Sequence, residues 1–215
     1  MLLRHGAGST LNLLILPALF EEANRMRRFT VSMMRGLADC GIGSILPDLP
    51  GTGESLIAIN NVTIDDWREA CAAAAKHVDP PLLTVSIRGG ALMDGIADFG
   101  WRLAPETGAR LVRDMLRATK LSDQLSTTGV DSQASERPTS LAGNGVGPGL
   151  FGKLSALAPI NGHYRTAQVT DNADECDLIL PGAKLWRAAE PSDDPEFVAA
   201  AVADIASWAK TCAGF

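Results

Sequence analysis

The sequence has few aromatic residues, no excess of basic residues and no long apolar run. Aromatic residues make up 5% of the 215 residues, which predicts an aliphatic core. The net charge of -6 gives no basic face of the kind that binds nucleic acid. No apolar stretch approaches the length that a membrane-spanning helix needs. We therefore expect a globular protein that has no nucleic-acid partner and no membrane span.

Cysteine is scarce as well. The four cysteines, Cys40, Cys71, Cys176 and Cys212, are scattered, and no two of them have the spacing of metal ligands. Free thiols in a reducing compartment account for them, so we expect a cytoplasmic protein. The sequence accordingly predicts no metal and no cofactor. Its length suits one domain over residues 1–215.

Buried strands and helices alternate along the chain. Apolar runs predict strands over residues 11–16, 43–46, 82–87 and 101–104, and shorter strands over 166–170 and 177–180. The segments that connect or follow them predict helices over residues 21–40, 63–78, 89–99, 108–125 and 195–210. This alternation is typical of an α/β domain in which helices cover both faces of a mostly parallel sheet.

Two regions depart from the alternation. Residues 126–149 are rich in Ser, Thr, Gly and Pro, and residues 150–158 predict a short helix. We interpret 126–158 as a small lid or an insertion between core elements. We also expect a short N-terminal part before the first buried strand.

A Gly/Pro-rich loop follows the second predicted strand. Its pattern, Asp-x-Pro-Gly-x-Gly-x-Ser over residues 48–55, resembles the loop after the fourth strand of the α/β-hydrolases. In that fold the next strand ends in Gly-x-Ser-x-Gly, where small flanking residues let a sharp turn expose the nucleophile. Here Ser86 and Gly90 provide the small flanks, and Arg88 takes the place of the nucleophile. A guanidinium stays protonated and cannot attack an ester.

Ser86 is the other candidate nucleophile at this turn. Its own flank would then be Arg88, which is too bulky for a sharp elbow, so we interpret Ser86 as a small packing residue. The catalytic histidine is expected after the last strand, where this chain has Leu185. Of the three histidines, His163 is the best remaining candidate for a base. The sequence therefore predicts a degenerate Ser–His–Asp triad.

A narrower resemblance concerns the first helix. Residues 19–28 resemble the Phe-Ala-Glu-Glu-Met-Asn-x-x-Arg-Arg segment of the exosortase A system-associated hydrolases of the second type. That family also carries Gly-x-Arg-x-Gly at the elbow and an aromatic pair where this chain has Leu185-Trp186. The resemblance covers about residues 11–120 and 165–210. It implies a hydrolase-fold protein linked to exopolysaccharide production and protein sorting, and fold alone does not establish chemistry.

Seven polar residues should meet at the carboxyl ends of the strands: Glu21, Glu22, Asn24, Arg27, Arg28, Asp48 and Arg88. Two functions follow from this cluster. The first is a hydrolase or acyl transferase that acts on a small ester, thioester or acylated substrate. The second is a non-catalytic binding or scaffold protein that keeps an anion-binding pocket. In either case Arg88 binds an anion or pairs with Glu21 or Glu22 and locks the elbow. We also consider a homodimer.

Overall fold

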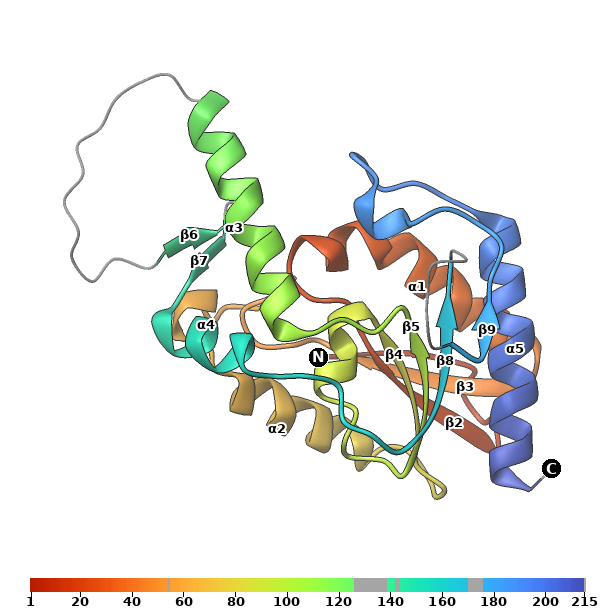
Figure 1. Cartoon of the computed structure of the whole chain (residues 1–215). Coiled ribbons are helices and arrows are strands. Elements are labelled where there is room, and N and C mark those ends of the chain that lie inside the picture. Colours follow the sequence, from red (N-terminus) through yellow and green to blue (C-terminus); the bar gives the residue numbers. More distant parts are fainter. Residues whose placement is uncertain (54, 126–138, 142–143, 170–175, 215) are drawn as a thin grey trace.

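The computed structural model describes residues 1–53, 55–125, 139–141, 144–169 and 176–214, and a seven-stranded sheet forms its centre (Figure 1). The strand order is β1-β3-β2-β4-β5-β8-β9. The strands are β1 Leu2–His5, β2 Leu11–Leu16, β3 Ile42–Pro47, β4 Leu83–Ile87, β5 Phe99–Leu103, β8 His163–Gln168 and β9 Leu178–Ile179. Every pair of neighbours is parallel except β1 and β3, which are antiparallel. The predicted mostly parallel sheet is confirmed.

Helices cover both faces of this sheet. Helices α1 (Glu21–Asp39) and α5 (Pro195–Ala213) pack on one face, and α2 (Ile64–Ala75), α3 (Gly108–Leu125) and α4 (Pro148–Ser155) pack on the other (Figure 1). The arrangement around strand β2 explains its apolar run from Leu13 to Leu16. Leu13 and Ile15 face the α1 and α5 layer, whereas Leu14 and Leu16 face the α2 layer. A strand that is buried on both faces needs apolar side chains at every position.

The predicted helix over residues 89–99 is wrong. The structure has a short 3-10 helix, η2 (Arg88–Leu92), and then turns that lead into β5 at Phe99. The cause is a buried ion pair, because Arg102 on β5 donates to both carboxylate oxygens of Asp94 at 2.7 and 2.8 Å. Asp94 is fully buried, and its place beneath the turn requires the chain to fold back there. No pattern in the local sequence predicts this ion pair.

The segment predicted as a lid has two parts. Residues 126–138 lie outside the described residues. The chain then forms a two-stranded hairpin, β6 (Thr139–Leu141) with β7 (Asn144–Val146), and continues into α4. Leu150 and Leu154 on α4 are fully buried in the core on the α2 side of the sheet. Helix α4 is therefore part of the helical layer.

Two further 3-10 helices are short: η1 (Ile59–Asn61) and η3 (Leu185–Arg187). Helix α2 begins as the sequence indicates. Thr63 accepts a hydrogen bond from the backbone of Asp66, and the Asp66 carboxylate accepts one from the backbone of Thr63 at 2.7 Å. Among the described residues, no helix combines the length and apolar character needed to cross a membrane.

Asp204 on α5 ties that helix to two strands. Its carboxylate accepts hydrogen bonds from the indole of Trp101 on β5 at 2.8 Å and from two guanidinium nitrogens of Arg165 on β8, both at 2.8 Å. Burial acts to raise the pKa of Asp204, but the bonds from Arg165 and Trp101 outweigh it and hold the pKa below its ordinary value. The charged form of Asp204 therefore stabilises the fold.

We expect Asp204→Asn to lower the free energy of unfolding at pH 7 by about 1–2 kcal/mol, because it removes a charge-assisted contact. A depressed pKa contributes stability above the ordinary carboxyl range and loses it as the pH falls through the folded-state pKa. The difference between the two proteins should therefore shrink in acid. Urea unfolding at pH 7 and at pH 3 measures this, with Asp79→Asn, in the exposed segment before β4, as the control. A pH-independent difference would contradict the assignment.

Candidate functional site

The carboxyl ends of three adjacent strands carry the strained backbone of the molecule. Phe20 after β2, Arg88 after β4 and Ala104 after β5 have φ angles of 56, 54 and 43°. Among the described residues, these are the non-glycine positions with positive φ. Such conformations cost about 1–3 kcal/mol each and concentrate at functional sites. The positive φ angles therefore indicate a functional site at the carboxyl ends of these three strands.

The turn at Arg88 keeps the shape of a nucleophile elbow. Arg88 has positive φ at its tip, directly after β4. A Cβ atom at Gly90 would collide with the carbonyl oxygens of Leu16 and Pro17, so the turn packs closely on the chain that follows β2. This close approach is the physical reason for a small residue at that position of the motif.

The side chain of Arg88 is held on several sides. Its Nε and Nη2 donate to the two carboxylate oxygens of Glu22 at 3.1 and 3.0 Å, and its Nη1 donates to the carbonyl of Ala104 at 2.8 Å. Its Nη2 also lies 3.3 Å from Glu106 Oε2, and the guanidinium carbon lies 4.7 Å from the ring centroid of Trp186. The prediction that Glu21 or Glu22 pairs with Arg88 is confirmed, and Glu22 is the partner.

Glu106 is the residue that the sequence reasoning missed. It follows β5, the neighbour of β4, so its carboxylate reaches the Arg88 turn from the next strand. Arg110, in the first turn of α3, lies 3.3 Å from the same carboxylate oxygen. An acid just beyond a predicted strand was the available signal, but its use depends on knowing that β5 lies beside β4.

Burial dominates the electrostatics of this cluster. The side chains of Arg88, Glu22 and Glu106 are 6, 18 and 10% exposed. Loss of water raises the pKa of Glu22 above its ordinary value, although the neighbouring Arg88 acts to lower it. Two carboxylates and the guanidiniums of Arg88 and Arg110 balance each other. Arg88 is therefore a paired charge that fastens the elbow to α1 and to the end of β5.

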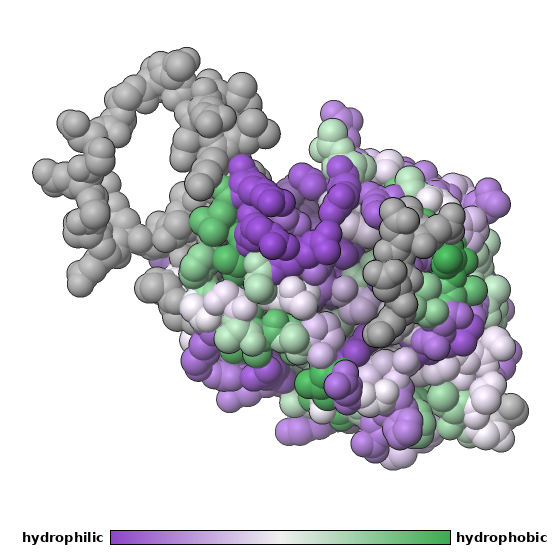
Figure 2. Space-filling model, in the orientation of Figure 1, coloured by the Kyte–Doolittle hydropathy of each residue, from purple (hydrophilic) through white to green (hydrophobic). Residues whose placement is uncertain are grey.

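A pocket of about 260 Å³ lies beside this cluster, and we call it the elbow pocket. Its lining combines apolar and charged residues: Leu19, Phe20, Glu21, Glu22, Arg25, Leu111, Asp114, Met115, Trp186 and Arg187. Figure 2 shows strongly hydrophilic side chains gathered over the space between α3 and the start of α1. Arg88 and Gly89 do not line the pocket, and a Cβ at Gly89 would meet the side chains of Leu111 and Leu19. The tip of the elbow is thus covered.

The seven predicted residues do not form one cluster. Glu21 and Glu22 line the elbow pocket, and Glu22 alone of the two holds Arg88. Asn24, Arg27 and Asp48 line a different pocket, of about 620 Å³, between α1 and the loop after β3. Arg28 lies on α1 and pairs with Asp193 at 2.6 Å, with 62% of its side chain exposed. The expectation of a single polar cluster is corrected in this way.

Ser86 lies beneath the elbow. Its side chain is fully buried, and its hydroxyl donates to Asp94 Oδ2 at 3.0 Å. This agrees with the prediction that Ser86 points into the packed layers. The same Asp94 oxygen accepts the 2.7 Å bond from Arg102, whose guanidinium stacks 3.4 Å from the ring centroid of Tyr164. Ser86 is therefore one donor in a buried network that replaces the expected helix.

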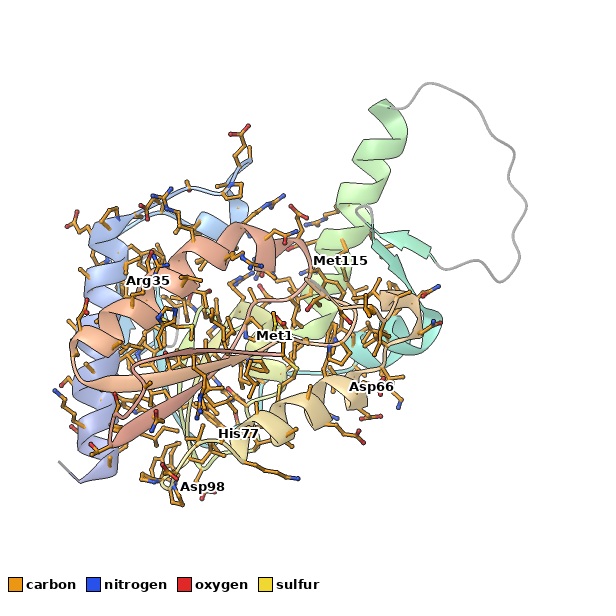
Figure 3. All side chains as sticks on the ribbon, turned by 180° about the vertical axis from the view of Figure 1, so that it is seen from behind. Met1, Arg35, Asp66, His77, Asp98 and Met115 are labelled. Carbon is orange, nitrogen blue, oxygen red and sulfur yellow. The ribbon has the colours of Figure 1, made fainter. Side chains whose placement is uncertain are left out.

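The three histidines lie at the other end of the strands, away from the elbow. His163 is the first residue of β8, not part of the preceding loop, and stacks on Phe99 at the start of β5 with ring centroids 5.3 Å apart. His5 pairs with Ser44 near the start of β3, and His77 follows α2 before β4 begins. Figure 3 shows His77 near one end of the molecule and Met115, which lines the elbow pocket, toward the other.

The described residues contain no group of three or more His, Cys, Asp or Glu side chains that could hold a metal ion. At the level of sequence, no family model and no curated protein matches the chain. Solved structures do. Mouse alpha/beta hydrolase domain-containing protein 10 has a TM-score of 0.62 and 11% identity, over 98% of this chain and 94% of the other. The chain has the α/β-hydrolase fold.

Two further solved structures are similar to this chain. Est1E from Butyrivibrio proteoclasticus, with ferulic acid bound, has a TM-score of 0.53 and 14% identity, over 79% of this chain and 74% of Est1E. A structure from the metagenome-derived lipolytic enzymes LipS and LipT has a TM-score of 0.52 and 16% identity, over 78% and 74% of the two chains. At these identities the likeness concerns the fold.

Arg88→Ala should destabilise the protein by about 3 kcal/mol, because it leaves the buried carboxylate of Glu22 without its cation and removes one of the two guanidiniums beside Glu106. Adding Glu22→Gln to Arg88→Ala should recover part of the loss, since it removes the stranded charge. Chemical unfolding measures both. Arg28→Ala is the matched control, because its exposed pair with Asp193 should contribute less than about 1 kcal/mol. If Arg88→Ala and Arg28→Ala lowered the free energy of unfolding by equally small amounts, the role of Arg88 as a buried, paired charge would be contradicted.

Proposed function

We propose that this chain is a hydrolase-fold binding protein that holds a small acylated compound with an anionic group in the elbow pocket. The observation that carries the proposal is the tip of the elbow, where Arg88 stands in place of a nucleophile and is locked by Glu22. A serine hydrolase needs an exposed hydroxyl at this tip. The elbow pocket lies beside the elbow, so the protein can bind a ligand there without serine catalysis.

The arrangement of Ser86 and the histidines supports a degenerate triad. A catalytic serine must share a hydrogen bond with a histidine that takes its proton. Ser86 has no exposed surface, and its hydroxyl donates a hydrogen bond to Asp94. The three histidines lie at the other end of the strands, away from the elbow. Acyl transfer through a serine at the elbow would need a different arrangement of each of these groups.

The walls of the elbow pocket indicate the ligand. Leu19, Leu111 and Met115 provide an apolar surface suited to a short acyl chain. Arg187 at the rim is exposed, and among the described residues its guanidinium has no ion-pair partner. A carboxylate or phosphate on the ligand would supply the missing charge. The volume of about 260 Å³ suits a small compound.

The resemblance of residues 19–28 to the exosortase A system-associated hydrolases supports a role in exopolysaccharide production and protein sorting. The four cysteines are free thiols, which supports a cytoplasmic location. The esterase and lipolytic descriptions of the structural neighbours supply acylated compounds as the class of ligand that we carry over to this chain.

A second candidate function is hydrolysis with Glu22 as a general base. The observation that favours it is the raised pKa of Glu22 together with its place on the pocket wall. A raised pKa makes the carboxylate a stronger base toward water, and the activity would then rise as the pH increases through that pKa. In this case Glu22→Gln abolishes hydrolysis, while Ser86→Ala leaves its rate unchanged.

We expect no stoichiometric labelling by a fluorophosphonate probe and no hydrolysis of p-nitrophenyl acyl esters above the buffer rate. Both follow from the burial of Ser86 and the absence of a hydroxyl at the tip. A serine esterase with an intact triad is the positive control. Labelling that disappears in Ser86→Ala would overturn the binding function. Unlabelled protein with ester hydrolysis that Glu22→Gln removes would establish the second candidate instead.

Octanoate should raise the thermal unfolding midpoint, and octanamide should do so less, because only the carboxylate pairs with Arg187. Arg187→Gln should remove most of the difference between the two compounds. Arg28→Gln, on an exposed ion pair away from the pocket, is the control. Equal shifts for octanoate and octanamide in the unmodified protein would refute the anionic group.

A further inference from the structure

Two buried arginines of this protein hold carboxylates by the same side of the guanidinium, the side formed by Nε and Nη2. Arg88 binds the two oxygens of Glu22 in this way at 3.1 and 3.0 Å, and Arg102 binds those of Asp94 at 2.7 and 2.8 Å. The spacing of these two donors matches the two oxygens of a carboxylate. An arginine in a pocket whose Nε–Nη2 side has no acceptor is therefore a candidate to bind an anionic ligand.

Arg25, on the wall of the elbow pocket, is such an arginine. Its Nη1 donates to the carbonyl of Trp186 at 3.2 Å, which fixes one end of the guanidinium. Its Nε is buried and has no hydrogen-bond partner within the described part of the chain. A buried N–H without an acceptor has lost its water without compensation. The Nε–Nη2 side of Arg25 therefore gains from any carboxylate that reaches it.

Glu21 is the acid beside this side of Arg25, and its contact is loose. Its Oε1 lies 3.8 Å from Arg25 Nε, which is beyond hydrogen-bond distance. Its other oxygen accepts a long bond of 3.4 Å from Asn24, and 47% of the side chain is exposed. An exposed pair one helical turn apart contributes little to stability. A second anion can therefore replace Glu21 at small cost.

Arg25 also contacts the segment that carries Arg187, the arginine that the proposed function assigns to the ligand. The hydrogen bond to the Trp186 carbonyl joins the Arg25 guanidinium to η3, and Arg187 is the last residue of η3. Both arginines line the elbow pocket. A carboxylate has enough lone pairs to accept from two guanidiniums at once.

We propose that Arg25 is the specificity-determining residue for the anionic group of the ligand, and that Glu21 takes the place of this group in the ligand-free protein. The inference rests on the proposed function of the elbow pocket. On binding, the Glu21 carboxylate turns into water, and the ligand carboxylate accepts hydrogen bonds from Nε and Nη2 of Arg25. Arg187 contacts the same carboxylate from the rim. The preference for anionic over neutral ligands therefore depends on Arg25, and Glu21 reduces it by competition.

Calorimetric titration with octanoate and octanamide tests the proposal. Arg25→Gln should weaken octanoate binding about fivefold and leave octanamide binding unchanged, because only the carboxylate needs the guanidinium. Glu21→Gln should tighten octanoate binding about threefold, because a neutral amide competes less well for Arg25. In the Arg25→Gln background the same Glu21→Gln change should have no further effect, because the guanidinium for which Glu21 competes is gone.

Two variants are the controls. Asp114 is another acid on the pocket wall, so Asp114→Asn should change octanoate binding by the same factor with and without Arg25. Arg28 lies on the same helix as Arg25 but pairs with Asp193 away from the pocket, so Arg28→Gln should leave the binding of both compounds unchanged.

The outcomes separate this inference from the proposed function. Equal binding of octanoate and octanamide by the unmodified protein would refute the proposed function and the inference with it. A preference for octanoate that persists in Arg25→Gln would overturn the role of Arg25 alone. Equal weakening of both compounds in Arg25→Gln would also overturn it, because Arg25 would then only support η3. An undiminished effect of Glu21→Gln in the Arg25→Gln background would overturn the competition.

Discussion

The ion pair between Arg88 and Glu22 fixes the arrangement of this site. It joins the turn after β4 to the first turn of α1, and the Ala104 carbonyl extends the contact to the end of β5. All three connections meet at the strained backbone positions of the sheet edge. A conformation such as that of Arg88 persists only where its surroundings determine it. Here a buried guanidinium with fixed partners provides that constraint.

A second buried ion pair supports the same turn from below. Asp94 and Arg102 hold the short crossing from β4 to β5, and the hydroxyl of Ser86 donates into the pair. Buried charges need such partners, because each would otherwise lose its water without compensation. The serine in the strand before the elbow is consequently a structural donor. Two buried ion pairs, Arg88–Glu22 and Arg102–Asp94, hold the elbow in this conformation, and the elbow pocket lies beside it.

The two pockets differ in how their charges are used. Around the elbow pocket most charged side chains have partners within the protein, with Arg187 at the rim as the exception that we assign to a ligand. In the pocket between α1 and the loop after β3, Arg27 and Asp48 lie in a wall of mixed polar and apolar side chains, and neither has an ion-pair partner among the described residues. Phe20, the residue before α1, lines both pockets and has a positive φ. The residues that the sequence suggested form a single cluster thus line two pockets.

The sequence by itself determined the features that depend on local pattern. The apolar run from Leu13 to Leu16 identifies β2, because a strand that is buried on both faces needs such a run, and the elbow motif after β4 places Arg88 at the tip. The energetic need of a buried guanidinium for a negative partner then led to Glu21 or Glu22, and the structure selects Glu22. Tertiary structure alone decided the contacts between distant segments: Glu106 beside Arg88, Asp94 against Arg102, and the separation of Arg27 from the elbow. Strand order and packing set those distances, and no periodicity along the chain records them.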